Sequence, residues 1–341
     1  MSVIISDLSF YGSANMAETD GITQGGAVAF NKRVVFNDIN PAGLLNYVSS
    51  GADTTQTITV TGRDATGAIQ TETKTFNGTT PVAGAQTFER LLKGVISAAT
   101  AVGDLAAISN TAIVTGTAVS VAAATSSAPA QITLAAGQGA SVSPGQIVRI
   151  TGGTTGINQL RMIVSVSGDV CNLNRDWDAL PTGTITYGVY EGMLFDKLPN
   201  QVTEVRRPFY NVSADVAGGA NRTYYEKIFA VNNNTATALT AASIIKQVDP
   251  VGATSLQFAL ASALNDTGTV ANRQTAPAAG ITAFSTGAAP QTIAVPTPQN
   301  LPSGAAPNAA GAQGVWLALT LNAGLAAGKT SLVIRTTGST T

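Results

Sequence analysis

The chain has 341 residues, of which 11% are charged and 44% are hydrophobic. An ordinary soluble protein carries roughly a quarter of charged residues, so this surface is unusually poor in charge. The net charge is −1 with no run of like charges, which gives no electrostatic footprint for nucleic acid or an anionic membrane. There is no histidine and only one cysteine. These two facts exclude Ser-His-Asp and Cys-His catalysis, His-ligated metals and thiolate zinc sites.

Small polar and small apolar residues take the place of the missing charges. Disorder is excluded as the explanation, because it needs low hydrophobicity together with high net charge. Hydroxyls and amides cost far less to bury than charges. The composition therefore favours a protein packed against neighbours, although a rapidly evolving extracellular β-protein has the same bias.

Targeting signals are absent from the sequence as given. Its first residues lack a positive segment followed by an apolar run, and no stretch approaches the ~18 apolar residues of a membrane helix. We expect synthesis in a cytoplasm, no membrane partner and release by a non-secretory route such as lysis. The single cysteine, Cys171, lies in a strand-like run, which predicts an inert buried thiol over a reactive one.

Residues 1–28 mix polar and small groups with little periodicity, which predicts an extended N-terminal arm. The arm carries the apolar residues Phe10, Tyr11 and Met16 without an evident local core. These three residues are therefore candidates for contacts between subunits.

Residues 29–118 are expected to form an N-terminal β domain. Thr57–Thr61 alternates between threonine and apolar residues, which is typical of a half-buried strand. A turn at Asp64–Gly67 leads to a polar strand from Ile69 to Phe76, interpreted as an edge strand or a half-buried strand. Over residues 86–99, apolar residues recur with helical spacing and predict a helix, with a strand as the alternative. This stripe consists of Phe88, Leu91, Leu92, Val95 and Ile96.

Residues 119–131 consist mostly of small residues and are interpreted as a linker. Residues 128–192 then predict a small β-barrel module, because short apolar runs alternate with turns about every ten residues. The five expected strands are Gln131–Leu134, Gln146–Thr151, Leu160–Val166, Val170–Leu173 and Ile185–Tyr190.

Residues 193–341 are expected to form a C-terminal β-sandwich domain. It is expected to end in a hairpin made of Val315–Leu321 and Thr330–Arg335. A loop at 285–313, rich in proline and alanine, is long enough to suggest contacts with partners. Arg206 and Arg207 form a dibasic pair, interpreted either as an intersubunit salt bridge or as a solvated turn. The predicted fold class is mainly β: sandwich-like domains, an inserted barrel module and an extended arm.

No motif predicts an enzyme or a cofactor. The segment Gly324–Thr330 is similar to a phosphate-binding loop, but three residues separate its glycines where the signature has four. A strand-like run follows it instead of a helix, so we expect a hairpin turn. The acidic residues are scattered singly, without the paired carboxylates of glycosidases. We therefore predict no catalytic, metal-binding or cofactor-binding residues.

Three segments resemble structural proteins of tailed-bacteriophage virions. Thr57-Ile-Thr-Val-Thr-Gly-Arg-Asp-Ala-Thr-Gly67 is similar to a strand–turn–strand theme in such proteins. The stretch from Val148 to Arg161, with Leu173-Asn-Arg-Asp-Trp177, resembles a small β-module of phage structural and fibre proteins. The third segment, Gly314-Val-Trp-Leu-Ala-Leu-Thr-Leu, resembles their C-terminal hairpins. The resemblance implies a non-enzymatic virion component assembled in a host cytoplasm.

The composition and this resemblance together favour a capsid decoration or cement protein. Its partners would be other virion proteins, either the major capsid protein or neck and tail subunits, and copies of itself as a homo-oligomer. A neck, tail-tube or baseplate subunit is the first alternative, and a receptor- or glycan-binding spike is the second. The spike is disfavoured by an aromatic content of 6%. The two tryptophans, Trp177 and Trp316, are expected in cores or at their rims rather than on sugar-binding platforms.

Overall fold

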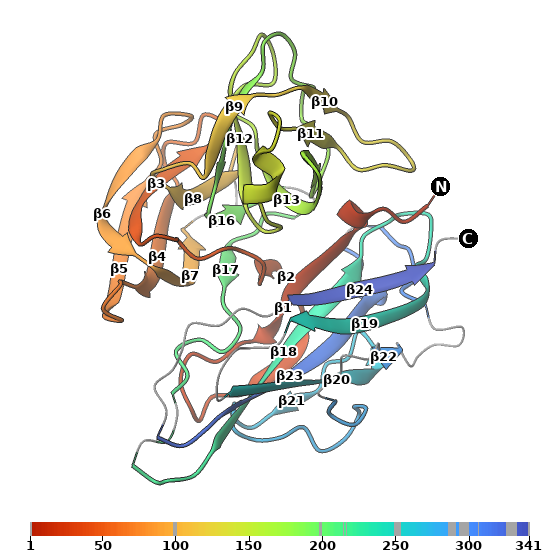
Figure 1. Ribbon diagram of the computed structural model, residues 1–341. Coiled ribbons are helices and arrows are strands. Elements are labelled where there is room, and N and C mark those ends of the chain that lie inside the picture. The colour runs from red at the N-terminus through yellow and green to blue at the C-terminus, as the bar shows by residue number, and fades with distance from the viewer. Residues whose placement is uncertain are drawn as a thin grey trace. The chain divides into compact units, whose positions relative to one another are not determined.

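The computed structural model describes residues 2–97, 101–197, 200–213, 215, 217–248, 254–285, 291–292, 300–305, 307–324 and 333–339 (Figure 1). The protein is mainly β, with 51% strand and 3% helix, as the sequence predicted. Two compact units are present. The central unit comprises Ile4–Asp7 and Asn31–Arg207. The terminal unit comprises Met1–Val3, Leu8–Phe30 and Pro208–Thr341.

These units differ from the predicted domain boundaries. Residues 29–118 and 128–192 were expected to form two domains, yet nearly all of them belong to the central unit. Most of the expected arm belongs to the terminal unit, together with the C-terminal part of the chain. The chain passes from one unit to the other within a single strand, β2 (Gln24–Arg33), so no change in composition marks the boundary.

Two sheets form a sandwich in the central unit. One contains β16, β8, β3 and β6 in that order, and the other contains β17, β7, β4 and β5. Their bounds are Gly192–Phe195 (β16), Leu105–Ser109 (β8), Gly43–Ser49 (β3), Val82–Phe88 (β6), Glu204–Arg206 (β17), Arg90–Ile96 (β7), Thr57–Arg63 (β4) and Ile69–Thr75 (β5).

In the sheet that contains β3, the strands β16, β8 and β3 are buried on both faces. Tyr47, Leu105 and Phe195 contribute to the core shared with β4 and β7. Their neighbours along the strands, such as Val48 and Leu194, join a second core with β12 and β13 of the following sheet. Because successive residues of a strand face opposite sides, continuously apolar strands place this sheet between two others. The central unit therefore has three layers.

The third layer of the central unit is a seven-stranded antiparallel sheet, called here the module. All five strands expected in this region are present as β11 (Gln131–Thr133), β12 (Ile147–Gly152), β13 (Leu160–Ser167), β14 (Val170–Leu173) and β15 (Thr186–Tyr190). Two further strands, β9 (Val114–Thr117) and β10 (Ser120–Ala122), extend the sheet at either end. The predicted linker at 119–131 is therefore wrong over β10. Small residues suit this end strand, which is largely exposed.

The helix expected over residues 86–99 is also wrong, because the alternative, a strand, is what forms. Phe88 ends β6 and the other four residues of the stripe lie in β7. A register shift between β4 and β7 leaves Leu92 as an extra residue, so that Leu91 and Leu92 are buried in succession. Gly94 is needed because a Cβ there would lie 2.8 Å from the ring of Phe195 and 2.9 Å from the sulfur of Met193.

The terminal unit contains a sheet in the order β20, β23, β18, β1 and β2, with β21 paired to β2, and a three-stranded sheet in the order β22, β19 and β24. The bounds are Leu8–Asn15 (β1), Arg222–Asn232 (β18), Thr240–Val248 (β19), Thr254–Leu264 (β20), Thr269–Val270 (β21), Gln291–Thr292 (β22), Ala312–Leu321 (β23) and Val333–Ser339 (β24).

The expected C-terminal hairpin is wrong, because β23 pairs with β18 and β20 whereas β24 pairs with β19. Nine of the ten residues of β23 are buried, which suits a central strand.

The expected N-terminal arm is a pair of sheet strands. β1 pairs antiparallel with β18, and β2 lies beside β1 in the same sheet. Tyr11 packs edge-on against Phe30 at 5.2 Å between ring centroids. It belongs to a core cluster with Phe229 and Val231 of β18. No local pattern indicates this core, because its other half lies more than 200 residues away along the chain.

Candidate functional site

A buried network of charges joins the module to the middle sheet of the central unit. Asp104 precedes β8, and its carboxylate accepts a hydrogen bond from Nη1 of Arg161 in β13 at 2.9 Å. Both side chains are completely buried. Arg175 donates to the same carboxylate oxygen and also pairs with Asp178. The network binds loops of the module to the start of β8, so it fixes the position of the module on the sandwich.

A second buried ion pair lies close to this network. Arg33, at the end of β2, pairs with Asp196, which follows β16, and the side chains are 6% and 0% exposed. Asn174 donates to the same aspartate at 3.1 Å and accepts from the backbone N–H of Met162 at 2.8 Å. These groups are fully engaged with one another. They link the end of β2, the residue after β16 and the loop after β14.

The terminal unit contains a buried lysine. The side chain of Lys227 in β18 is completely buried and pairs with Asp266. Its ammonium group also donates to the carbonyl oxygens of Asp266 at 2.8 Å and Gly26 at 3.1 Å. It lies over the rings of Phe229 and Trp316 at 5.0 and 5.6 Å from their centroids. Burial lowers the pKa of Lys227, and Asp266 opposes this shift.

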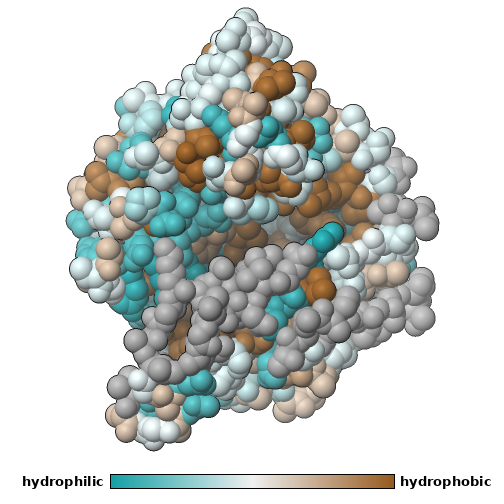
Figure 2. Space-filling model, viewed as in Figure 1, coloured by the Kyte–Doolittle hydropathy of each residue, from teal (hydrophilic) through white to brown (hydrophobic). Residues whose placement is uncertain are grey.

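At least eleven charged residues are buried, among 18 basic and 19 acidic residues in the chain. Charged residues are seldom fully buried unless they are paired. Burial on this scale makes an already charge-poor exterior poorer still. On the face drawn in Figure 2, hydrophilic residues in teal and hydrophobic residues in brown lie among pale residues of intermediate hydropathy.

Most of the residues predicted to contact other subunits are buried or paired within the chain itself. Tyr11 is 2% exposed and Met16 is 6% exposed, so the reason for choosing them, the lack of a local core, was wrong. Phe10 is half-buried in β1 and remains a candidate. Arg206 lies in β17, is 1% exposed and pairs with Glu204 at 3.5 Å. Arg207 pairs with Asp38, so the dibasic pair is not a solvated turn.

Cys171 is a buried thiol, as the sequence predicted, and it lies in the core of the module. Burial, aided by the charge of Asp169, raises its pKa to about 11. Because the thiolate is the reactive form, we expect the native protein to resist alkylation by iodoacetamide at pH 8. Mass spectrometry should find the adduct only after unfolding in guanidinium chloride. Rapid modification of the native protein would contradict this assignment.

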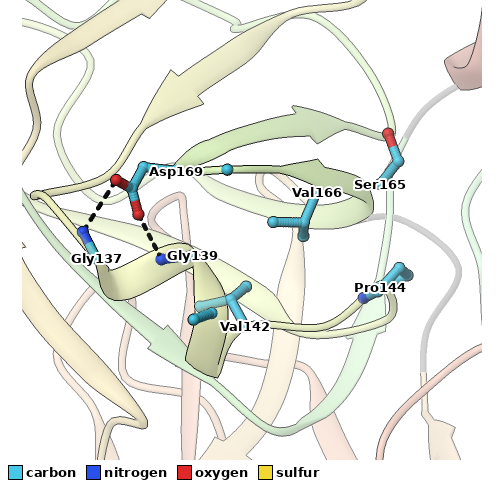
Figure 3. Close-up of a pocket in the computed structure, with 9 residues that line it drawn as sticks. Gly137, Gly139, Val142, Pro144, Ser165, Val166 and Asp169 are labelled. Atoms are coloured by element: carbon cyan, nitrogen blue, oxygen red, sulfur yellow. Dashed lines mark hydrogen bonds between the residues drawn. The ribbon is translucent and has the colours of Figure 1, made fainter.

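The module contains a pocket of about 660 Å³ between the short helix η2 (Gln138–Ser141) and the β13–β14 turn (Figure 3). Asp169 is its only carboxylate, and it accepts from the N–H groups of Gly137 and Gly139 at 2.9 and 2.7 Å. These two donors hold the pKa of Asp169 below its ordinary value. The hydroxyl of Ser165 accepts from Asn172 at 2.8 Å. Neither group is paired with a base, so the lining resembles a structural turn more than a reaction centre.

The β4–β5 hairpin presents a regular array of threonines. Thr59 and Thr73 are cross-strand partners whose hydroxyls lie 2.8 Å apart, and Thr61 and Thr71 form the next pair at 3.4 Å. The threonines of β5 are exposed and those of β4 are half-buried, while Ile58 and Val60 face the core between them. The alternation in the sequence predicted these faces, and the interpretation of Ile69–Phe76 as an edge strand agrees with the place of β5 at the end of its sheet.

Two predicted features lie largely outside the described residues. The loop at 285–313 is described only in part, at 285, 291–292, 300–305 and 307–313. The segment similar to a phosphate-binding loop is described only at Gly324. Trp177 and Trp316 are 6% and 2% exposed, in agreement with their expected places in cores.

The buried charge network was missed at the sequence level, although a weak signal was present. Arg161 and Asp104 stand next to strongly apolar runs, where an unpaired charge would be costly. The pairing itself joins residues 57 positions apart and required the fold.

Within the described part of the chain, no group of three or more Asp, Glu or Cys side chains is placed to hold a metal ion. No helix among the described residues has the length and apolar character needed to cross a membrane. The chain matches no protein-family model, no curated protein and no solved structure.

Proposed function

We propose that this chain is a non-enzymatic structural component of a tailed-bacteriophage virion that decorates and stabilises the capsid. The observation that carries the proposal is the distribution of charge. At least eleven of the 18 basic and 19 acidic residues are buried, several of them in ion pairs, which leaves an exterior poor in charge. Such a surface can be covered by neighbouring subunits at a low desolvation cost.

The architecture supports the same role. Three packed layers in the central unit and the ionic network at Asp104 make a rigid body, which suits a subunit that must hold its shape under load. The segments that resemble virion proteins, Thr57–Gly67 and the 148–177 stretch, lie in the β4–β5 hairpin and the module. The pocket beside η2 has a carboxylate that is held by two backbone N–H groups and no base beside its hydroxyl, which favours a role without catalysis.

Copy number tests the proposal. Quantitative mass spectrometry of purified virions from cells that make this chain should find hundreds of copies per particle if it decorates the head. Tens of copies or fewer would assign it to the neck, tail tube or baseplate instead. Loss of host adsorption in a deletion mutant, with capsid stability unchanged, would identify a receptor-binding spike. Absence of the chain from the finished particle would overturn the virion role altogether.

A further inference from the structure

The strand β5 ends its sheet, and one of its edges is open. Among the strands that the structure describes, its only partner is β4. Unpaired backbone groups on an edge strand are a template for another strand unless they are covered. The chemistry of this edge therefore decides whether β5 is protected or available.

Two hydrogen bonds fix which residues of β5 point outward. Phe76 N–H donates to Gln56 O at 3.1 Å, and Asp64 N–H donates to Ala68 O at 3.0 Å. Both pairs continue the β4–β5 register, and hydrogen-bonded pairs alternate along an antiparallel ladder. The backbone groups of residues 70, 72 and 74 therefore face β4. Those of Thr71, Thr73 and Thr75 face away from it, and no backbone hydrogen bond to another described residue engages them.

The sequence of this edge is self-complementary. Thr71-Glu72-Thr73-Lys74-Thr75 reads almost alike in both directions about Thr73. In an antiparallel pair of two β5 strands centred on Thr73, Thr73 faces its own copy and Thr71 faces Thr75. Glu72 then faces Lys74 of the copy at both non-hydrogen-bonded positions, so opposite charges and not like charges are opposed there. Within one chain the Glu72 side chain is 6% exposed and pairs with Lys74 of its own strand at 3.3 Å, so the charges favour this register by avoiding repulsion and not by forming a new ion pair.

Other two-fold registers lose this match. Centring the pair on Thr71 places Glu72 opposite Gln70 and Lys74 opposite Ala68. Centring it on Thr75 places Lys74 opposite Phe76 and Glu72 opposite Gly78. The register centred on Thr73 also aligns the outward-facing backbone groups of all three threonines, which a strand-to-strand contact requires.

The edge of the neighbouring strand β6, unlike that of β5, is partly covered by a side chain. The carboxylate of Glu72 accepts from the backbone N–H of Ala85 at 2.6 Å and from the hydroxyl of Tyr47 at 2.9 Å. This side chain covers part of the β6 edge, and a Cβ on Gly84 would lie 2.6 Å from its Oε2. β6 is thus protected by a charged side chain, whereas β5 keeps its outward backbone groups available.

We propose that a second copy of this chain pairs with β5 in an antiparallel two-fold contact centred on Thr73. The two hairpins then form a continuous four-stranded array, and the threonine ladders of each copy continue into the other. The contact is small, so it is weak between two free chains and gains strength where many copies are held together. It depends on β5 alone and not on the proposed virion role.

Cysteine cross-linking tests the register in the full-length chain. In a hydrogen-bonded antiparallel pair the facing Cα atoms lie about 5.5 Å apart, within the range that a disulfide spans. Thr73→Cys should therefore form a disulfide-linked dimer under mild oxidation at least about tenfold faster than Thr71→Cys. Thr71 lies about 13 Å from its own copy in this register, four residues along the partner strand.

The control variants place a cysteine on the same edge of β5, at threonines that are also exposed. A mixture of Thr71→Cys and Thr75→Cys chains should cross-link, although neither variant does so alone. The wild-type chain should not cross-link, because its thiol, Cys171, is buried. Equal rates for all three single variants would indicate random collision and would overturn the proposal.

Sedimentation velocity provides a measurement without added thiols. Thr73→Val keeps the outward N–H and should retain concentration-dependent association. Thr73→Pro removes that N–H and should abolish association, while circular dichroism verifies that the edge strand tolerates proline. A wild-type chain that remains monomeric up to millimolar concentration would overturn the proposal, and so would association that survives Thr73→Pro.

Discussion

Replacing Asp104 with alanine is expected to lower the free energy of unfolding by about 3–5 kcal/mol, the usual cost of removing one partner of a buried ion pair. Two arginines depend on this carboxylate. Arg161 is completely buried, and the side chain of Arg175 is 15% exposed. Since whole domains are stable by only about 5–15 kcal/mol, we expect a large shift of the guanidinium chloride midpoint.

Asp178→Ala is the matched control for this prediction. Asp178 contacts the same two arginines, but its side chain is 51% exposed, so water replaces it at small cost. We expect a loss of less than about 1 kcal/mol for this variant. Equal losses for the two variants would show that burial of the Asp104 pair does not stabilise the module on the sandwich.

Asp266→Asn is expected to destabilise the terminal unit by about 2–3 kcal/mol at pH 7, in the range for a hydrogen bond to a charged group. The loss should be smaller than at Asp104, because the side chain of Asp266 is 22% exposed and backbone carbonyls still accept from Lys227. Thermal unfolding followed by circular dichroism measures this difference.

The pH dependence of this variant has a defined sign. The folded-state pKa of Lys227 is already lowered by burial, and loss of Asp266 removes the attraction that opposes the shift. Between the folded-state and unfolded-state pKa values the unfolded chain binds more protons, so the unfolding free energy rises with pH. We expect Asp266→Asn to regain stability between pH 7 and 10 more steeply than the wild type.

The double variant Lys227→Met with Asp266→Asn provides the control for the charge itself. With no buried ammonium left, the added pH dependence should disappear, and the stability should exceed that of Asp266→Asn. A slope as steep as that of the single variant would assign the pH dependence to another group.

The two buried charge networks are better explained by the geometry that they fix than by the stability that they add. Buried ion pairs are often no more stabilising than apolar residues of the same shape, so stability alone does not account for them. They hold particular loops in one arrangement, at the start of β8 in the central unit and between β18 and the 266–268 turn in the terminal unit. An assembly subunit needs such fixed geometry, because its contacts must repeat in every copy.

The sequence by itself determined the β class, the five main strands of the module, the faces of the β4–β5 hairpin and the burial of Cys171, Trp177 and Trp316. These features depend on local alternation and turn residues, which act within about ten positions of the chain.

Only the tertiary structure decided the places of residues 8–30, of β7 and of β23. The partners of β1 and β23 lie in distant parts of the sequence, and a bulge at Leu92 makes a strand imitate helical spacing. The pairing of Asp104 with Arg161 has the same origin. Long-range strand order determines which charges meet and which backbone groups remain unpaired, and local periodicity carries no information about that order.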